Sequence, residues 1–181
     1  MGEITVAANA LLMQLFTLFS YFMDGFAYAG EALTGRYIGA RRSDELRLMI
    51  HRLFRIGTVV SLMATLLYLL FPAALLSVLS DKYEVIEHAR RFAFWAGVVP
   101  IVSFAAFLWD GVFVGATASK AMRRAMTAAF VVFFATFFLL RGALGETALW
   151  LAFVLYLLTR SLMQTVWYRR HFFATNRLQR C

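Results

Sequence analysis

The chain begins with one long apolar stretch, Ile4–Gly39, which reads ITVAANALLMQLFTLFSYFMDGFAYAGEALTGRYIG. Its length decides the fold class, because a bilayer core about 30 Å thick is crossed by an α-helix of about 20 apolar residues. The stretch lacks the apolar–polar alternation, over about ten residues, of a membrane β-strand. The sequence therefore predicts a membrane-spanning helix close to the N-terminus.

Four further apolar runs follow the first and predict four more spanning helices. The 181 residues are 62% hydrophobic and 17% aromatic, whereas soluble domains are about 45–50% apolar. We expect helices at about residues 4–39, 45–79, 84–115, 121–141 and 146–168. No stretch of different composition interrupts them. The sequence thus predicts an all-α polytopic bundle of five spanning helices, with residues 1–181 as a single membrane unit.

The basic residues alternate along the chain in a topological pattern. Fourteen of the eighteen Lys and Arg lie between the first and second helices, between the third and fourth, or in the last helix and tail; four lie in the other two connections. Positively charged connections stay cytoplasmic. We therefore expect a multi-pass inner (plasma) membrane protein with its N-terminus outside and its C-terminus inside. The net charge of +8 is interpreted as topology plus contact with anionic lipids, and not as nucleic-acid binding.

The residue types used in metal centres and nucleophilic catalysis form no motif in this sequence. Cys181 is the lone cysteine, and His51, His88 and His171 lack metal-ligand spacing. We expect no cofactor, no metal centre and no enzymatic activity. Glu3 stands where a signal peptide would be basic, so the first helix is expected to be retained.

Polar side chains of the first helix recur at intervals of three and four residues, which places them on one face. We call this face the polar stripe; its polar members are Gln14, Thr17, Tyr21, Asp24, Tyr28 and Glu31. One charged residue at the centre of a spanning helix costs about 2.5–3.5 kcal/mol on insertion scales, so the stripe should not face lipid. The stripe is interpreted as lining a path for a coupling cation or a cationic substrate. The alternative is a structural contact in which Tyr21 or Tyr28 donates to Asp24 and an arginine neutralises Glu31.

Two more charged residues lie inside apolar runs, Asp110 in the third and Arg160 in the fifth. At 1.5 Å per residue, Glu31, Asp110 and Arg160 all lie about 13–15 Å inside the cytoplasmic boundary. Arg160 is predicted to form a bidentate ion pair with Asp110 or Glu31. For Asp110 the sequence leaves two roles open, a structural ion pair and direct binding of the coupling cation.

Two pairs of glycines have the spacing that lets spanning helices approach closely. They are Gly35 with Gly39 and Gly111 with Gly115, near the ends of the first and third helices. Small residues four apart favour close backbone contact in membranes. We assign these four glycines to helix packing and not to chemistry.

Three segments resemble the multidrug and toxic compound extrusion (MATE) transporters, particularly their DinF-like branch. They are GEITVAANALLMQLF at residues 2–16, GRYIGARRSDELR at 35–47 and LWDGVFVGATASKAMRRAM at 108–126. The resemblance extends through essentially the whole chain in order and topology. It implies that the chain corresponds to helices eight to twelve of a twelve-helix carrier built from two six-helix lobes.

The resemblance also implies a function. Such carriers exchange inward-moving H⁺ or Na⁺ for outward-moving organic cations by alternating access. The second-lobe cation site of the family uses an acid of helix ten, which Asp110 resembles, so Na⁺ binding is expected at Asp110 if Na⁺ is the coupling ion. Its other acid belongs to helix seven, outside this sequence.

Two hypotheses about function follow from these observations. In the first, the chain is a truncated C-terminal portion of a drug–cation antiporter, inactive alone and needing an N-terminal lobe or a separate partner chain. In the second, it is a non-transporting membrane assembly protein whose polar stripe docks another helix bundle.

Overall fold

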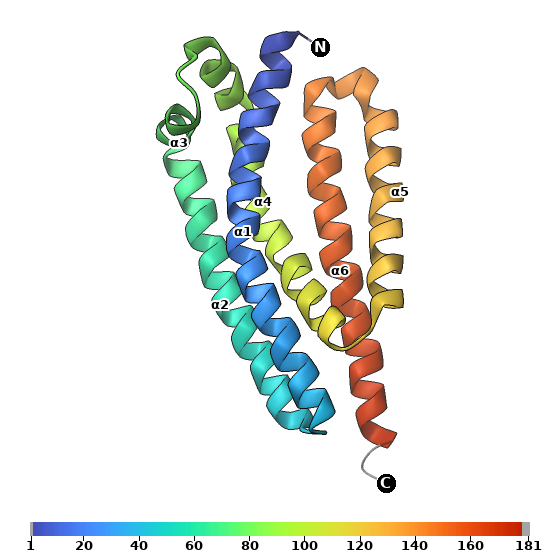
Figure 1. Ribbon diagram of the computed structural model, residues 1–181. Coiled ribbons are helices and arrows are strands. Elements are labelled where there is room, and N and C mark those ends of the chain that lie inside the picture. Colours follow the sequence, from blue (N-terminus) through green and yellow to red (C-terminus); the bar gives the residue numbers. More distant parts are fainter. Residues whose placement is uncertain (1, 179–181) are drawn as a thin grey trace.

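The computed structural model describes residues 2–178, and side chains as far as residue 170. The described residues form six helices and no strand (Figure 1): α1 Glu3–Gly39, α2 Ser43–Leu70, α3 Pro72–Leu79, α4 Tyr83–Gly115, α5 Ser119–Leu144 and α6 Glu146–Leu178. Five of them, all except α3, are long and apolar enough to cross a membrane. The prediction of an all-α bundle with five spanning helices is confirmed.

The second predicted helix, 45–79, is wrong as a single element, because the chain breaks at Phe71. Phe71 has φ −126° and ψ 43°, and Pro72 is the first residue of the eight-residue α3. A residue before proline is disfavoured in the α region, and proline lacks the N–H needed to continue the ladder. The side chains on both sides of this point are hydrophobic, so the length of the apolar run alone did not reveal the break.

The last two helices extend beyond their predicted ends and are joined by one residue. α5 runs to Leu144 and α6 starts at Glu146, with Gly145 between them at φ +54° and ψ −124°. L side chains rarely adopt this backbone region, which glycine tolerates. Gly145 thus permits the direct reversal that lays α5 against α6.

The third predicted span, α4, lies at the centre of the molecule. It packs against each of the other described helices, and Figure 1 shows it passing between the α1–α2 pair and the α5–α6 pair. Half of the residues in the most apolar 18-residue stretch of α4 are buried, whereas the figure for α5 is 6%. The outer face of α5 carries exposed Phe134, Phe138 and Leu139, as expected for a helix that faces lipid.

Two glycines of α4 bring its backbone against α1. A Cβ added at Gly111 would overlap the carbonyl group of Ala27, and one added at Gly115 would overlap the carbonyl oxygen of Glu31. At Gly35 an added Cβ would lie 3.6 Å from the carbonyl oxygen of Gly115, an ordinary contact. The two helices start at the same end of the bundle, so this is a parallel contact (Figure 1).

Gly39 requires a correction. A Cβ built on Gly39 would meet nothing within 4 Å among the described residues, because α1 ends there and its last turn is exposed. The spacing of Gly35 and Gly39 therefore does not mark a packing contact at Gly39 in this chain.

Candidate functional site

Asp110 of α4 is bound on both carboxylate oxygens by α6. Arg160 Nη2 donates to Oδ2 in an ion pair, and Gln164 Nε2 donates to Oδ1 at 2.7 Å. Arg160 and Gln164 lie four residues apart, which places them on one face of α6. Of the two partners expected for Arg160, the structure supplies Asp110 and not Glu31.

Further hydrogen bonds join the same two helices beside this cluster. Trp109 Nε1 donates to Thr165 Oγ1 at 2.8 Å, and Ser161 Oγ donates to the carbonyl oxygen of Val102 at 3.0 Å. We call this contact the α4–α6 polar interface; its side chains are Trp109, Asp110, Arg160, Ser161, Gln164 and Thr165. It lies inside the bundle, since the side chains of Arg160 and Asp110 are 12% and 22% exposed and Gln164 is fully buried.

Two polar atoms of this interface have no hydrogen-bond partner among the residues that the structure describes. Arg160 Nε, a donor, and Gln164 Oε1, an acceptor, are both buried without a hydrogen bond. Both carboxylate oxygens of Asp110 therefore have hydrogen-bond partners, whereas one polar atom each of Arg160 and Gln164 has none. Buried polar atoms are rarely left in this state without a role or a bound water.

Sequence reasoning missed Gln164 and Thr165, because neutral polar residues in a spanning helix carry no insertion penalty large enough to attract notice. One signal was available. Gln164 lies four positions after Arg160 and Thr165 four positions after Ser161, so these residues form two adjacent rows along the helix.

The structure places Gln14 and the two tyrosines of the polar stripe on the side of α1 that the other described helices leave uncovered, and the two acids at the edge of that side. Tyr21 and Tyr28 are each 70% exposed, Gln14 is exposed, and Asp24 and Glu31 are half-buried. The packed face of α1 carries other residues, among them Leu12, Phe19, Met23 and Thr34. The stripe therefore lines an outer surface of these helices.

Within the part of the chain that the structure describes, no side chain of the stripe bonds to another side chain, and only Thr17 forms a hydrogen bond, to the carbonyl oxygen of Met13 in its own helix at 2.9 Å. The alternative in which Tyr21 or Tyr28 donates to Asp24, and an arginine neutralises Glu31, is thus not realised among these helices. Asp110 is likewise not brought to the stripe, because both of its oxygens are bound to α6.

The depth predicted to be common to Glu31 and Asp110 needs correcting by more than one helical turn. Gly111 lies against Ala27 and Gly115 against Glu31, so Asp110 is level with the residues just before Ala27. At 1.5 Å per residue, Glu31 lies about 6–8 Å further along the common direction of the two helices. Asp110 is thus level with a point between the two acids of the stripe.

A second polar cluster closes the end of the bundle where α1 begins. Glu146 of α6 accepts a hydrogen bond from Thr5 Oγ1 at 2.9 Å and contacts His88 Nε2 at 3.1 Å. Trp150 Nε1 donates to Asn9 Oδ1 at 2.9 Å beside it. These contacts join α1, α4 and α6 far from Asp110.

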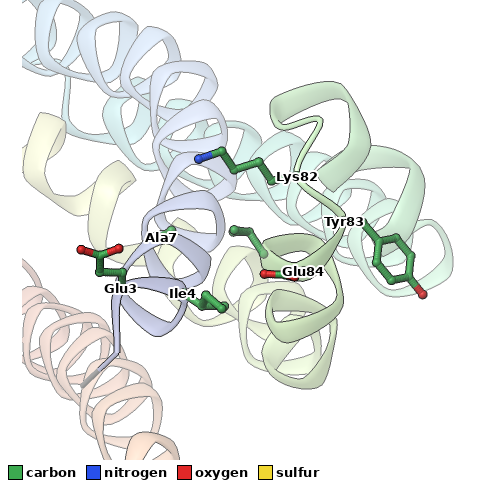
Figure 2. Close-up of a pocket in the computed structure, with 7 residues that line it drawn as sticks. Glu3, Ile4, Ala7, Lys82, Tyr83 and Glu84 are labelled. Carbon is green, nitrogen blue, oxygen red and sulfur yellow. The ribbon is translucent and has the colours of Figure 1, made fainter.

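A pocket of about 390 Å³ opens at that same end, between α1 and the start of α4. Figure 2 shows Ile4 and Ala7 of α1 facing the segment of Lys82 and Glu84, while the ring of Tyr83 points away from α1. None of the residues predicted to bind a cation lines it. The pocket is therefore separate from the candidate site.

Among the described residues, no group of three or more His, Cys, Asp or Glu side chains is arranged to hold a metal ion. The side chains of His171 and Cys181 lie outside the described residues. His51 lies on α2 and His88 on α4, and His88 contacts Glu146 as stated above.

Comparison with known proteins identifies the family of the chain. Residues 1–139, which include α1, α2, α3, α4 and most of α5, match the MatE family model. DNA damage-inducible protein F of Escherichia coli (strain K12) is 36% identical over 171 residues, 94% of this chain and 37% of that protein. The chain thus spans little more than a third of the length of this relative. It is a multi-pass membrane protein that belongs to the MatE family of transporters, which are not enzymes.

Proposed function

We propose that these helices form one part of an inner-membrane efflux carrier that exports organic cations in exchange for H⁺ or Na⁺. The observation that carries the proposal is the polar stripe, whose tyrosines are exposed on α1 beside two half-buried acids, in a chain of the MatE family. Anionic lipid headgroups are the proposed contacts of its basic connections, and nucleic acid is not a proposed partner.

The chemistry of the stripe suits an organic cation. Tyr21 and Tyr28 present aromatic faces, which attract cations, at positions seven residues apart on one face. Asp24 lies between them and Glu31 follows one turn later, so negative charge and aromatic surface alternate along the helix. Gln14 extends the polar path towards the end of the bundle where α1 begins.

A second helical unit is part of this proposal. Two half-buried acids at the edge of an uncovered face are unfavourable against lipid, and they gain stability when they face protein or a water-filled path. Alternating access in carriers of this kind is a movement of one repeat against another. We therefore propose that the stripe faces a further helical unit, supplied as an N-terminal lobe or as a separate chain, and that the described helices do not transport alone.

Efflux of a fluorescent lipophilic cation tests the proposal in cells that lack their own drug pumps. The chain is expressed alone and together with the N-terminal part of the E. coli relative that it does not match. Efflux is expected from the pair and not from the chain alone. In the pair, Asp24→Asn with Glu31→Gln should abolish efflux, while Asp44→Asn, at an exposed acid outside the stripe, should not.

The same cells distinguish the transport role of the stripe from the hypothesis that the stripe only docks another helix bundle. The two polypeptides are purified together from detergent extracts of each variant. If the double stripe variant keeps efflux whenever the pair is present but reduces the amount of pair recovered, the stripe is a docking surface and the transport role is wrong.

A further inference from the structure

We infer that the guanidinium of Arg160 occupies the cation position at Asp110, so that this acid is closed to Na⁺ while the α4–α6 polar interface is intact. The inference rests on the proposed function in one respect, because only that function makes Asp110 relevant to transport. It concerns a site that the family resemblance assigns to the coupling cation, H⁺ or Na⁺, and that this chain fills with its own side chain.

Both oxygens of Asp110 are in use. Oδ2 accepts from Arg160 and Oδ1 accepts from Gln164 at 2.7 Å. An ionised carboxylate only accepts hydrogen bonds, so the Gln164 amide must turn its NH₂ group towards Asp110 and its oxygen away. A hard cation needs several oxygen ligands, and the oxygen that Gln164 offers is directed away from the acid.

The charges balance without an added ion. Arg160 carries one positive charge and Asp110 one negative charge, and the contact lies inside the bundle, with 12% and 22% of the side chains exposed. A Na⁺ ion at Asp110 would leave the guanidinium unpaired in the same buried space, which is strongly unfavourable. Na⁺ therefore reaches Asp110 only when Arg160 leaves.

Removal of Arg160 should create the site that Arg160 fills. With a neutral residue at position 160, Asp110 Oδ2 loses its partner and keeps its charge. Gln164 Oε1 is already buried and without a hydrogen bond, and rotation of the amide would direct this oxygen to the same place. The geometry thus predicts a gain of Na⁺ binding on loss of Arg160.

Thermal unfolding of the full chain in detergent, with NaCl or choline chloride at equal ionic strength, tests the inference. The wild-type midpoint should be the same in both salts. Arg160→Gln should gain a saturable rise of several degrees specific to Na⁺, and Asp110→Asn in the Arg160→Gln background should remove it. Arg160→Lys, which keeps a tethered cation, should behave as the wild type does. Absence of a Na⁺ effect in folded Arg160→Gln would overturn the inference.

Equilibrium binding of radioactive Na⁺ to the wild-type chain gives a second arm that needs no folded Arg160 variant. Wild type should show no saturable binding. Saturable binding that Asp110→Asn abolishes would show an open Na⁺ site and overturn the inference. Neither arm measures transport, so a failure of the stripe variants to alter efflux would remove the proposed function and leave this result standing.

Discussion

Asp110 connects α4 to α6 through both of its carboxylate oxygens. Charges within a protein interior are stable when they are paired and hydrogen-bonded, and removing one partner leaves the other without compensation. Arg160 supplies the opposite charge and Gln164 the second hydrogen bond. The three side chains should therefore behave as a unit when they are mutated.

A double-mutant cycle on Asp110 and Arg160 tests this coupling. Loss of one partner of a buried ion pair lowers the free energy of unfolding by about 3–5 kcal/mol. Because this pair is partly exposed, we expect losses near the lower end of that range for Asp110→Asn and for Arg160→Gln. The double variant should lose less than the sum of the two single variants. Reversible denaturation in detergent measures the free energies, and strict additivity would contradict the coupling.

Gln164→Leu is expected to destabilise the chain by about 1.5–3 kcal/mol, because a hydrogen bond to an ionised group is lost inside the bundle. Met163→Leu provides the matched control, since it is the adjacent residue, is exposed and changes little in volume. The same denaturation measurement should show a loss below about 0.5 kcal/mol for the control. Equal losses in the two variants would remove the special role of Gln164.

At the scale of elements, α1 and α4 are held by contact between backbones and α4 and α6 by contact between polar side chains. Gly111 and Gly115 allow the first contact. The sequence indicated it through the spacing of small residues, but the same spacing at Gly35 and Gly39 was misleading in part. Spacing shows which residues share a face, and it does not show which face another helix covers.

Gly111→Ala and Gly115→Ala should each destabilise the chain by at least about 1–3 kcal/mol, because overpacking at these positions displaces backbone and not a flexible side chain. Gly39→Ala and Gly25→Ala are the controls, since an added Cβ there meets nothing within 4 Å. Thermal midpoints in detergent should fall for the first pair and stay level or rise for the second. A uniform response of all four would contradict the close contact.

Comparison of the predicted and observed helix bounds shows which features of the fold can be predicted from hydropathy. Apolar length identified the five spans because the energetic cost of exposing backbone groups to lipid leaves few alternatives to a helix. The sequence analysis missed the break at Phe71 and Pro72, because the hydrophobicity of a side chain does not report the backbone angles of its residue. The proline itself was the signal that should have divided that run.

At the scale of the whole molecule, the start of α1 and the end of α6 lie at opposite ends of the bundle (Figure 1), as five crossings require. The assignment of the ends to the two sides of the membrane stays a prediction from the charges. The sequence also could not show that the polar stripe and Asp110 face different directions. That outcome depends on the rotation of α1 and α4 about their axes, which packing at Ala27 and Gly111 decides.

Cysteine labelling tests the predicted orientation. Ala40→Cys lies in the turn after α1 and Asp81→Cys in the segment before α4, and both positions are exposed. In a Cys181→Ser background, a membrane-impermeant maleimide should label Asp81→Cys in spheroplasts and Ala40→Cys only after permeabilisation. The opposite pattern would place the N-terminus inside.

The half-buried acids of α1, Asp24 and Glu31, also bear on how the protein is made and removed in the cell. Insertion scales assign each such acid at a helix centre about 2.5–3.5 kcal/mol, so α1 should leave the translocation channel slowly and be open to membrane proteases when it is synthesised alone. In pulse–chase experiments the half-life of the chain should lengthen when the second helical unit is synthesised in the same cell. Asp24→Asn with Glu31→Gln should lengthen it without that unit, so the two carboxylates would set how long an unassembled chain survives.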